Sequence, residues 1–424
     1  MRYDHLLKIN ADDCIGCTRC MRVCPTEAIR IVDGKVRLST KHCVECGECL
    51  LNCHCHAFVI KGDEYERLSE FKYNIAILPI AIYGMVKEQR DMGVIFETLT
   101  DLGFDEVFET STFYELLSEE IEVYINEHDQ YPYILTQCPS MIKFVQTSFP
   151  DTSSKFLPFD LPFEVCAKYL REIYAVKLKL NQSEIGISYI SECLANLQAI
   201  KQPLGKLKSN IDLVFLLSTI FKDILQHLNV TIDDKFTISK KGILWSKVGA
   251  LRRTTNIIDY LSVDGISQVG NILEKVELGQ LNHIKIIECY ACIGGCVGGT
   301  FTLENPFVAK TKVNALHETL QENHNLEVYQ DLKEKLNKDF WLFSEPLEGS
   351  AIKGLAVDFF TSLIKLQQIN DLYAKLPKID CCACGSPSCR ALAEDVANGI
   401  KQMEDCVVLN RVNGRDTDES KKFN

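Results

Sequence analysis

Short apolar runs alternate with longer amphipathic segments between about residue 70 and residue 310. The apolar runs predict strands at Asn74–Ile82, Glu106–Phe108, Tyr133–Leu135, Ile185–Ile190, Leu213–Leu217 and Ile284–Ile287. The amphipathic segments have helical spacing and predict helices at Thr112–His128, Phe163–Tyr174, Ser218–His227 and Gly265–Val276. Strands that alternate with helices of roughly ten or more residues indicate an α/β domain in which the strands are largely parallel.

The pattern differs on both sides of this central region. Residues 1–62 are rich in cysteine, and the polar run Lys61–Arg67 at their end is expected to be a linker. Residues 313–350 are charged and weakly amphipathic, which predicts a linker. A helix is expected at Ala356–Tyr373, within a small helical domain at residues 351–412, and the polar tail 413–424 is expected to be disordered. The predicted organisation is an N-terminal domain at 1–62, a central α/β domain at 70–312, the linker and the small C-terminal domain.

Composition narrows the class of protein. Of the 424 residues, 46% are apolar, and the formal net charge is −12. This charge argues against nucleic acid and anionic membranes as main partners. No apolar run approaches the roughly eighteen residues of a membrane span. Residues Met1–Asp4 begin no signal peptide, so the thiols point to a reducing cytoplasm. The sequence does not specify the oligomeric state.

The twenty cysteines carry most of the chemical information. Two N-terminal runs each have the spacing C-x2-C-x2-C-x3-C, which presents three thiolates from one loop. In the bacterial two-cluster pattern, the fourth cysteine of each run binds the cluster of the other run. Cluster one is then expected to use Cys14, Cys17, Cys20 and Cys53, and cluster two Cys43, Cys46, Cys49 and Cys24.

The alternatives for these runs are disulfides and zinc. Disulfides are disfavoured in a reducing compartment, and zinc usually takes ligands in pairs rather than interlocked triplets. The two runs resemble the bacterial dicluster ferredoxin domain. The second run departs from that pattern because His54 replaces the usual proline and because Cys55 is an additional thiol.

The central domain places its cysteines after predicted strands. Cys138 follows Leu135, Cys193 follows Ile190, and a glycine-rich segment with Cys292 and Cys296 follows Ile287. Open α/β sheets place their sites at the carboxyl ends of strands. Glycines around the last two cysteines allow close approach of a bulky inorganic group.

These three segments resemble the signature loops of the iron-only (FeFe) hydrogenase catalytic domain, over about residues 70–312. There the loops read roughly T-S-C-C-P, M-P-C-x-x-K and E-x-M-A-C-x-x-G-C-x-x-G-G. The resemblance implies a central 4Fe-4S cubane held by Cys138, Cys193, Cys292 and Cys296. The alternative is a hydrogenase-like fold in which these cysteines contribute only to packing.

The departures from the family pattern concern its diiron subcluster. Gln137 stands in place of the proton-relaying cysteine, and Asn196 in place of the lysine that pairs with an iron-bound cyanide. Glu192 replaces a proline and Tyr290 a methionine. Asn196 offers no charge to an anion, and an ionised Glu192 would repel one. We therefore expect a cubane without the diiron subcluster.

The C-terminal segment carries the spacing C-x2-C-x4-C-x16-C. It resembles the small helical cluster domain of the B subunit of Rnf electron-transport complexes and of the corrinoid iron-sulfur protein, a domain that recurs in hydrogenase-like proteins associated with signalling. The resemblance implies a further 4Fe-4S cluster, with zinc as the rival metal. Its ligands would be Cys381, Cys384, Cys389 and Cys406.

The remaining thiols, Cys55, Cys166, Cys289 and Cys382, are expected to be spectators, with Cys289 the most ambiguous because it lies near Cys292. No glycine-rich loop after a strand matches a dinucleotide- or phosphate-binding motif, and the sequence identifies no catalytic residue. The expected function is electron transfer or redox sensing through about four 4Fe-4S clusters. Expected partners are a ferredoxin, an oxidoreductase or a signalling protein. The alternatives are a divergent hydrogenase and a reductase of an unknown substrate.

Overall fold

A computed structural model describes residues 5–87, 89–224, 238–321, 326–335, 338–349 and 359–415. The chain forms two compact units. Unit one contains Met1–Cys43, Glu48–Ile60 and Ala351–Asn424, and unit two contains Val44–Gly47 and Lys61–Ser350, each taken over its described residues. The first and the last described segments of the chain therefore belong to the same unit.

The N-terminal part of unit one consists of two small antiparallel sheets and two short helices. Strand β1 (Lys8–Ile9) pairs with β4 (Phe58–Val59), and β2 (Ile29–Val32) pairs with β3 (Lys35–Leu38). Asp33 and Gly34 join β2 to β3 with positive φ, as a tight hairpin turn requires. Helices α1 (Arg19–Val23) and α2 (Glu48–Leu51) carry Cys20 and Cys49.

The C-terminal part of unit one is helical. It contains α13 (Phe359–Lys375), α14 (Cys389–Ala397), the 3₁₀ turn η8 (Met403–Asp405) and α15 (Val407–Arg415). An apolar cluster that includes Ile369, Leu376 and Leu392 joins α13 to α14. The first residues of the predicted helix, 356–358, and residues 416–424 of the predicted tail lie outside the described residues.

The first sheet of unit two is parallel throughout, in the order β6-β5-β8-β9. Its strands are β5 (Tyr73–Ile77), β6 (Glu106–Phe108), β8 (Ile185–Ser191) and β9 (Leu213–Leu216). Every residue of β8 is buried, as expected for a central parallel strand covered on both faces. The helices of this part are α3 (Gln89–Asp101), α4 (Ser111–Glu127), α6 (Pro162–Leu178), α7 (Leu194–Lys201) and α8 (Leu217–Ile224).

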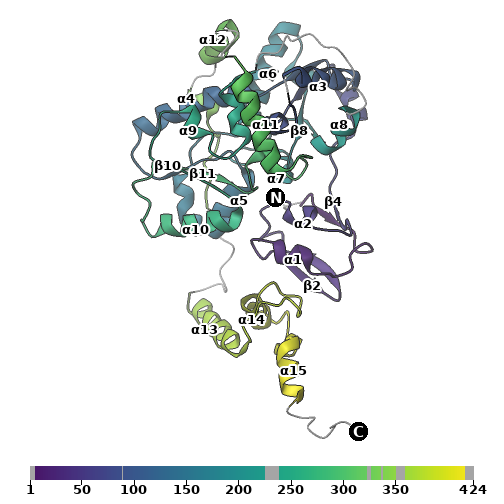
Figure 1. The fold of residues 1–424 in the computed structure, drawn as a ribbon, viewed down its shortest axis with the longest axis vertical. Coiled ribbons are helices and arrows are strands. Elements are labelled where there is room, and N and C mark those ends of the chain that lie inside the picture. The colour runs from purple at the N-terminus through teal and green to yellow at the C-terminus, as the bar shows by residue number, and fades with distance from the viewer. Residues whose placement is uncertain are drawn as a thin grey trace. The chain divides into compact units, whose positions relative to one another are not determined.

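The second sheet is also parallel, in the order β10-β11-β7. It consists of β7 (Tyr133–Ile134), β10 (Tyr260–Asp264) and β11 (Ile286–Tyr290), with α5 (Pro139–Ser148), α9 (Leu251–Thr254) and α10 (Ile266–Glu277). Residues of α5, α10 and β11 form one apolar core with Val44. Figure 1 shows the helices of unit two arranged around the strands.

Further helices complete unit two: α11 (Pro306–Thr319), α12 (Leu326–Lys335) and the 3₁₀ turns η1 (Tyr65–Glu70), η2 (Ile80–Gly84), η3 (Pro150–Lys155), η4 (Gln182–Glu184), η5 (Gly242–Ser246), η6 (Cys296–Gly298) and η7 (Lys338–Trp341). Residues predicted as a linker thus include α12 and η7, and Trp341 is completely buried. No helix among the described residues has the length and apolar character needed to cross a bilayer.

The α/β fold with parallel strands, the N-terminal ferredoxin-type part and the helical C-terminal part are confirmed. Three details of the prediction were wrong. The run Asn74–Ile82 is not one strand, because β5 ends at Ile77 and η2 begins directly after Pro79. The predicted strand Ile284–Ile287 begins at Ile286 and continues to Tyr290. Strand β10 was not predicted, since its residues are all only half-buried and lack a clear pattern.

Candidate functional site

The central cysteines lie at the carboxyl ends of both parallel sheets. Cys138 follows β7 and is the N-cap of α5, and Cys193 follows β8 and is the N-cap of α7. Cys292 and Cys296 follow β11. The backbone N–H of Asn196 donates to Cys193 Sγ at 3.4 Å. Helix N-termini favour negative charge, so both caps suit thiolates.

The four central cysteines interact electrostatically with one another. Burial, and then the charges of Glu192, Cys292 and Cys138, raise the pKa of Cys193 well above its ordinary value. Burial, followed by Glu192, Cys138 and Cys292, does the same for Cys296. These thiols therefore hold their protons unless a metal replaces them. The structure brings together the four residues that the sequence predicted for the cubane.

A glycine brings the third cysteine loop against the second. The Phe301 N–H donates to the Glu192 carbonyl oxygen at 2.8 Å. A Cβ atom on Gly299 would lie 2.6 Å from that same oxygen, which is closer than van der Waals contact allows. Only glycine fits at this position without a backbone shift. The contact holds the segment after Cys296 beside Cys193.

Polar atoms around Cys138 suit a bound cubane. Within the described part of the chain, the Ser140 hydroxyl is buried and makes no hydrogen bond, and the buried side-chain amide of Gln137 lies beside the Tyr290 hydroxyl. Buried donors normally have a partner, and the sulfides of an iron-sulfur cluster accept hydrogen bonds. The donor set and the surrounding thiols therefore fit a 4Fe-4S cubane held by the four central cysteines.

Glu192 is the centre of a buried polar group beside Cys193. Its side chain accepts hydrogen bonds from Tyr189 Oη at 2.8 Å and from Asn196 Nδ2 at 3.1 Å. Burial raises the pKa of Glu192. The Tyr189 ring is held by stacking on Phe163, with centroids 4.7 Å apart. The Asn196 amide is thus directed to a carboxyl group.

Two further phenols lie around Cys296. The Tyr290 hydroxyl donates to the Trp245 carbonyl oxygen at 3.4 Å. Burial, and then the charges of Glu288 and Cys296, raise the pKa of Tyr290 well above its ordinary value. Burial, and then the charges of Cys296 and Glu192, also raise the pKa of Tyr114 well above its ordinary value. The four positions at which the sequence departs from the hydrogenase pattern carry phenol, amide and carboxyl groups and no positive charge.

Sequence reasoning missed Tyr114, Tyr189 and Ser140. Ser140 and Tyr189 lie within a few residues of Cys138 and Cys193 and could have been found by that proximity. Tyr114 lies on α4, far from any cysteine in the sequence, so no local signal pointed to it.

The cysteines predicted for cluster one lie together in unit one. Cys14, Cys17, Cys20 and Cys53 line one small pocket. Cys55 lines the same pocket. Burial, with the charges of Cys17 and Cys53 as the next causes, raises the pKa of Cys20 to about 11. The residues fit a second cubane.

The cysteines predicted for cluster two are divided between the units. Cys24, Cys43 and Cys49 belong to unit one, and Cys46 belongs to unit two. The Ala28 N–H donates to Cys24 Sγ at 3.2 Å, and His5 Nε2 lies 3.2 Å from Cys43 Sγ. Their assembly around one cluster remains a prediction.

Three of the predicted C-terminal ligands lie in or against the apolar cluster of α13 and α14. Cys389 and Cys406 are buried within it, and Cys384 packs against it. Asp380 Oδ1 accepts the Cys389 N–H at 2.6 Å. Cys382 lies near Cys381 and Cys384, and its Sγ donates to the Pro387 carbonyl oxygen at 3.1 Å. Cys382 therefore has a local structural partner, as a bystander would.

The two other spectator thiols are fully buried. Cys166 lies on α6, and Cys289 lies within β11, where it joins the core of the second sheet. Among the described residues, no three His, Cys, Asp or Glu side chains converge closely enough to bind a single metal ion. A cubane is larger than an ion, so its thiolates lie further apart.

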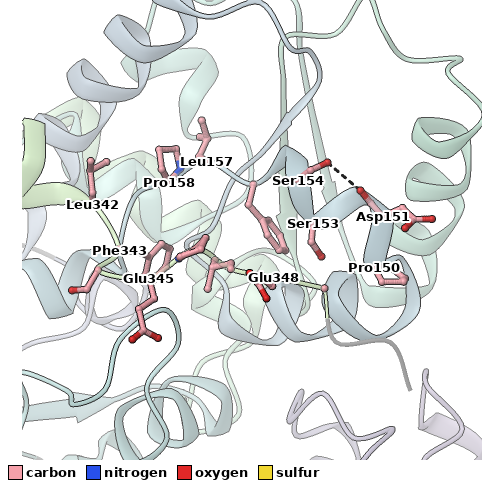
Figure 2. A pocket seen from close by; sticks show the side chains of 15 residues that line it. Pro150, Asp151, Ser153, Ser154, Leu157, Pro158, Leu342, Phe343, Glu345 and Glu348 are labelled. Carbon is pink, nitrogen blue, oxygen red and sulfur yellow. Dashed lines mark hydrogen bonds between the residues drawn. The ribbon is translucent and has the colours of Figure 1, made fainter. Parts of the chain in front are cut away.

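A larger cavity in unit two lies between residues 150–158 and residues 342–349. Figure 2 shows Leu157 and Pro158 on one segment and Leu342 and Phe343 on the other. Its lining contains carboxylates, including Asp151 and Glu345, but no cysteine. None of the predicted cluster ligands lines this cavity.

Three family models match separate parts of the chain. The model for the iron only hydrogenase large subunit, C-terminal domain, matches residues 76–235 and 231–300. The 4Fe-4S dicluster domain matches residues 6–54, and a putative Fe-S cluster domain matches residues 376–408. No curated protein matches the chain.

Solved structures share the fold of the central part. The structure of HydA(deltaEFG), which concerns stepwise FeFe-hydrogenase H-cluster assembly, is 15% identical, with 68% of this chain and 98% of that chain covered and a TM-score of 0.50. The apo form of a variant of FeFe-hydrogenase HydA1 from Chlamydomonas reinhardtii is 15% identical, with 68% and 97% covered and a TM-score of 0.51. Because the hydrogenase model covers more than half of its residues, the chain belongs to the iron-only hydrogenase large-subunit family, with an N-terminal 4Fe-4S dicluster domain and a C-terminal Fe-S domain.

Proposed function

We propose that this protein is a cytoplasmic electron-transfer or redox-sensing member of the hydrogenase family, with about four 4Fe-4S clusters and no diiron subcluster. The observation that carries the proposal is the buried group of Glu192, Tyr189 and Asn196 beside Cys193. Each 4Fe-4S cluster, held by one predicted set of four cysteines, would act as a one-electron carrier.

The buried group is poorly suited to an anionic diiron centre. In the related hydrogenases, a lysine pairs with an iron-bound cyanide, whereas here the Asn196 amide donates to Glu192. Glu192 is 1% exposed, so its ionised form would repel a neighbouring anion at low effective dielectric. Neither residue supplies the positive charge that would compensate a cyanide-bearing group, and an ionised Glu192 would add repulsion.

Contacts within unit two connect the segment of Cys46 with the central set. Cys46 and Cys138 pack against the same apolar cluster. Thr300, which follows Cys296 closely, donates through Oγ1 to the Cys46 carbonyl oxygen at 3.4 Å. Cys46 is a predicted ligand of cluster two, so this packing supports electron exchange with the central cubane.

Contacts within unit one connect the C-terminal domain with the ferredoxin-type part. The Ile31 N–H donates to the Gly385 carbonyl oxygen at 2.8 Å, and Arg30 Nε pairs with Asp395 Oδ2 at 2.8 Å. Arg22 Nη2 donates to the Cys381 carbonyl oxygen at 3.3 Å. These contacts support electron transfer between the C-terminal cluster and the N-terminal clusters.

The loop of cluster one offers a contact for a redox partner. Cys17 is exposed, and Ile15 is 67% exposed. An exposed apolar residue beside a cluster suits short-lived docking of a ferredoxin, an oxidoreductase or a signalling protein.

A reductase is the second candidate. The buried side-chain amide of Gln137, which lies beside the Tyr290 hydroxyl and directly before Cys138, offers a polar group to a small substrate beside the central cubane. Steady reduction of such a substrate by the reduced protein would favour this candidate over a carrier or sensor.

The number of clusters is tested by iron and sulfide analysis of anaerobically purified protein, with EPR of the reduced state. We expect about sixteen irons per chain, four for each cubane. The Cys193→Ala variant should lose about four irons from the central site, and the Cys166→Ala variant, which changes a buried thiol away from the proposed ligands, should lose none. A value of about eight irons in the wild type would mean that the central and C-terminal sites hold no cluster.

A further inference from the structure

Cluster one is surrounded by one thiol more than a cubane requires. Cys55 lines the same pocket as Cys14, Cys17, Cys20 and Cys53. Cys55 is half-buried, and it therefore lies beside the predicted ligands of cluster one. Neither the family match nor the spacing of the two runs assigns a role to Cys55.

The two cysteine runs end in loops of the same geometry. The His56 N–H donates to the Cys53 carbonyl oxygen at 3.2 Å, and the Glu27 N–H donates to the Cys24 carbonyl oxygen at 3.3 Å. His56 and Glu27 have φ values of 52° and 50°. Each loop also directs a backbone N–H at the sulfur of its fourth cysteine, from Ala57 at 3.4 Å and from Ala28 at 3.2 Å.

This correspondence places Cys55 where the first run has Thr26. Thr26 Oγ1 lies 3.8 Å from Cys24 Sγ, so a side chain at this position lies beside the fourth sulfur of its run. Only the second run carries a thiol there. The chain therefore contains its own matched control.

We propose that Cys55 is a second ligand for the iron of cluster one that Cys53 binds, so that either thiolate can complete the cubane. The proposal rests on cluster one as assigned above. In the exchange, the Cys55 thiol gives up its proton as its sulfur binds iron, and Cys53 takes up a proton as its own iron bond breaks. No electron is transferred, so no oxidant or reductant is needed.

The test compares Cys53→Ala, Cys55→Ala, the double variant and Cys24→Ala, purified anaerobically as full-length chains. Iron and sulfide per chain and the EPR spectrum of the reduced protein are measured, and circular dichroism reports on folding. Cys53→Ala should keep the iron content of the wild type and show altered g-values. Cys55→Ala should resemble the wild type. The double variant and Cys24→Ala should each lose about four irons.

Loss of about four irons by Cys53→Ala, with circular dichroism unchanged, would overturn the proposal. If Cys53→Ala unfolds, Cys53→Ser provides the same comparison, and the iron content of the wild type with altered g-values in that variant, together with loss of about four irons in the corresponding Cys24→Ser variant, would support it. The Cys14→Ala variant tests whether cluster one is present, independently of the role of Cys55. Unchanged iron in that variant would mean that cluster one itself is absent.

Discussion

At the scale of single residues, the proposed absence of hydrogen chemistry depends most on Glu192. Its carboxyl group is buried and accepts hydrogen bonds from Tyr189 and Asn196. A buried donor that loses its acceptor costs about 1–3 kcal/mol. The hydrogen bonds therefore hold the two partner side chains in place beside Cys193.

We predict that Glu192→Leu lowers the free energy of unfolding by about 2–5 kcal/mol, because two buried donors lose their acceptor. Glu192→Gln keeps an acceptor oxygen and should cost about 1 kcal/mol or less. Denaturant titration of the two variants and the wild type measures the difference. Equal stability of the Leu variant and the wild type would show that these hydrogen bonds do not contribute to the fold.

The sequence indicated the positions of this group but not its structure. Gln137, Glu192, Asn196 and Tyr290 could be singled out because they depart from a known pattern. The pairing of Glu192 with Tyr189 could not be foreseen, since it depends on how β8 ends and α7 begins. The sequence could not show that burial raises the pKa of Glu192.

At the scale of elements, the site depends on loops that follow β7, β8 and β11. Gly299 brings the loop after β11 within van der Waals distance of the Glu192 backbone. A side chain there must displace one of the two loops that carry cubane ligands.

We predict that Gly299→Ala loses about four irons from the central site while the other clusters remain. The reason is the 2.6 Å contact between the added Cβ and the Glu192 carbonyl oxygen. Gly270→Ala on α10 is the matched control, because its Cβ would meet no atom closer than 3.6 Å. Iron analysis with EPR measures the result, and full iron content in Gly299→Ala would refute the loop argument.

Element prediction succeeded where the apolar pattern was strong and failed where it was weak. The apolar run that forms β8 is buried throughout and was found at nearly its observed bounds. The half-buried β10 gave no such signal. Strand β11 extends further than predicted because Glu288 is buried, with Oε1 accepting the Gly249 N–H at 3.0 Å. Because Glu288 is a charged residue, the sequence pattern did not indicate that the buried strand continues through it.

At the scale of the whole molecule, the C-terminal domain and the N-terminal cysteines other than Cys46 belong to unit one. Arg30 and Asp395 form one link, with 23% and 7% of their side chains exposed. Asp395 Oδ2 also accepts from Ser386 Oγ at 2.7 Å. No local pattern predicts contact between segments so distant in sequence.

We predict that Arg30→Ala and Asp395→Ala each weaken this contact by about 1–3 kcal/mol, and that the two effects are not additive. A double-mutant cycle on the free energy of unfolding measures the coupling. Ser386→Ala is a control, because it removes a neighbour of Asp395 and leaves the Arg30 pair intact. Additive effects would indicate that the pair does not form in solution.

The central claim is that this hydrogenase fold carries electrons without hydrogen chemistry. It is tested most directly by treating the purified, cluster-loaded protein with a synthetic diiron cofactor and measuring its infrared spectrum together with hydrogen evolution and uptake. The account predicts no protein-bound cyanide or carbonyl bands and no hydrogen turnover. Stable bands together with sustained turnover would contradict it.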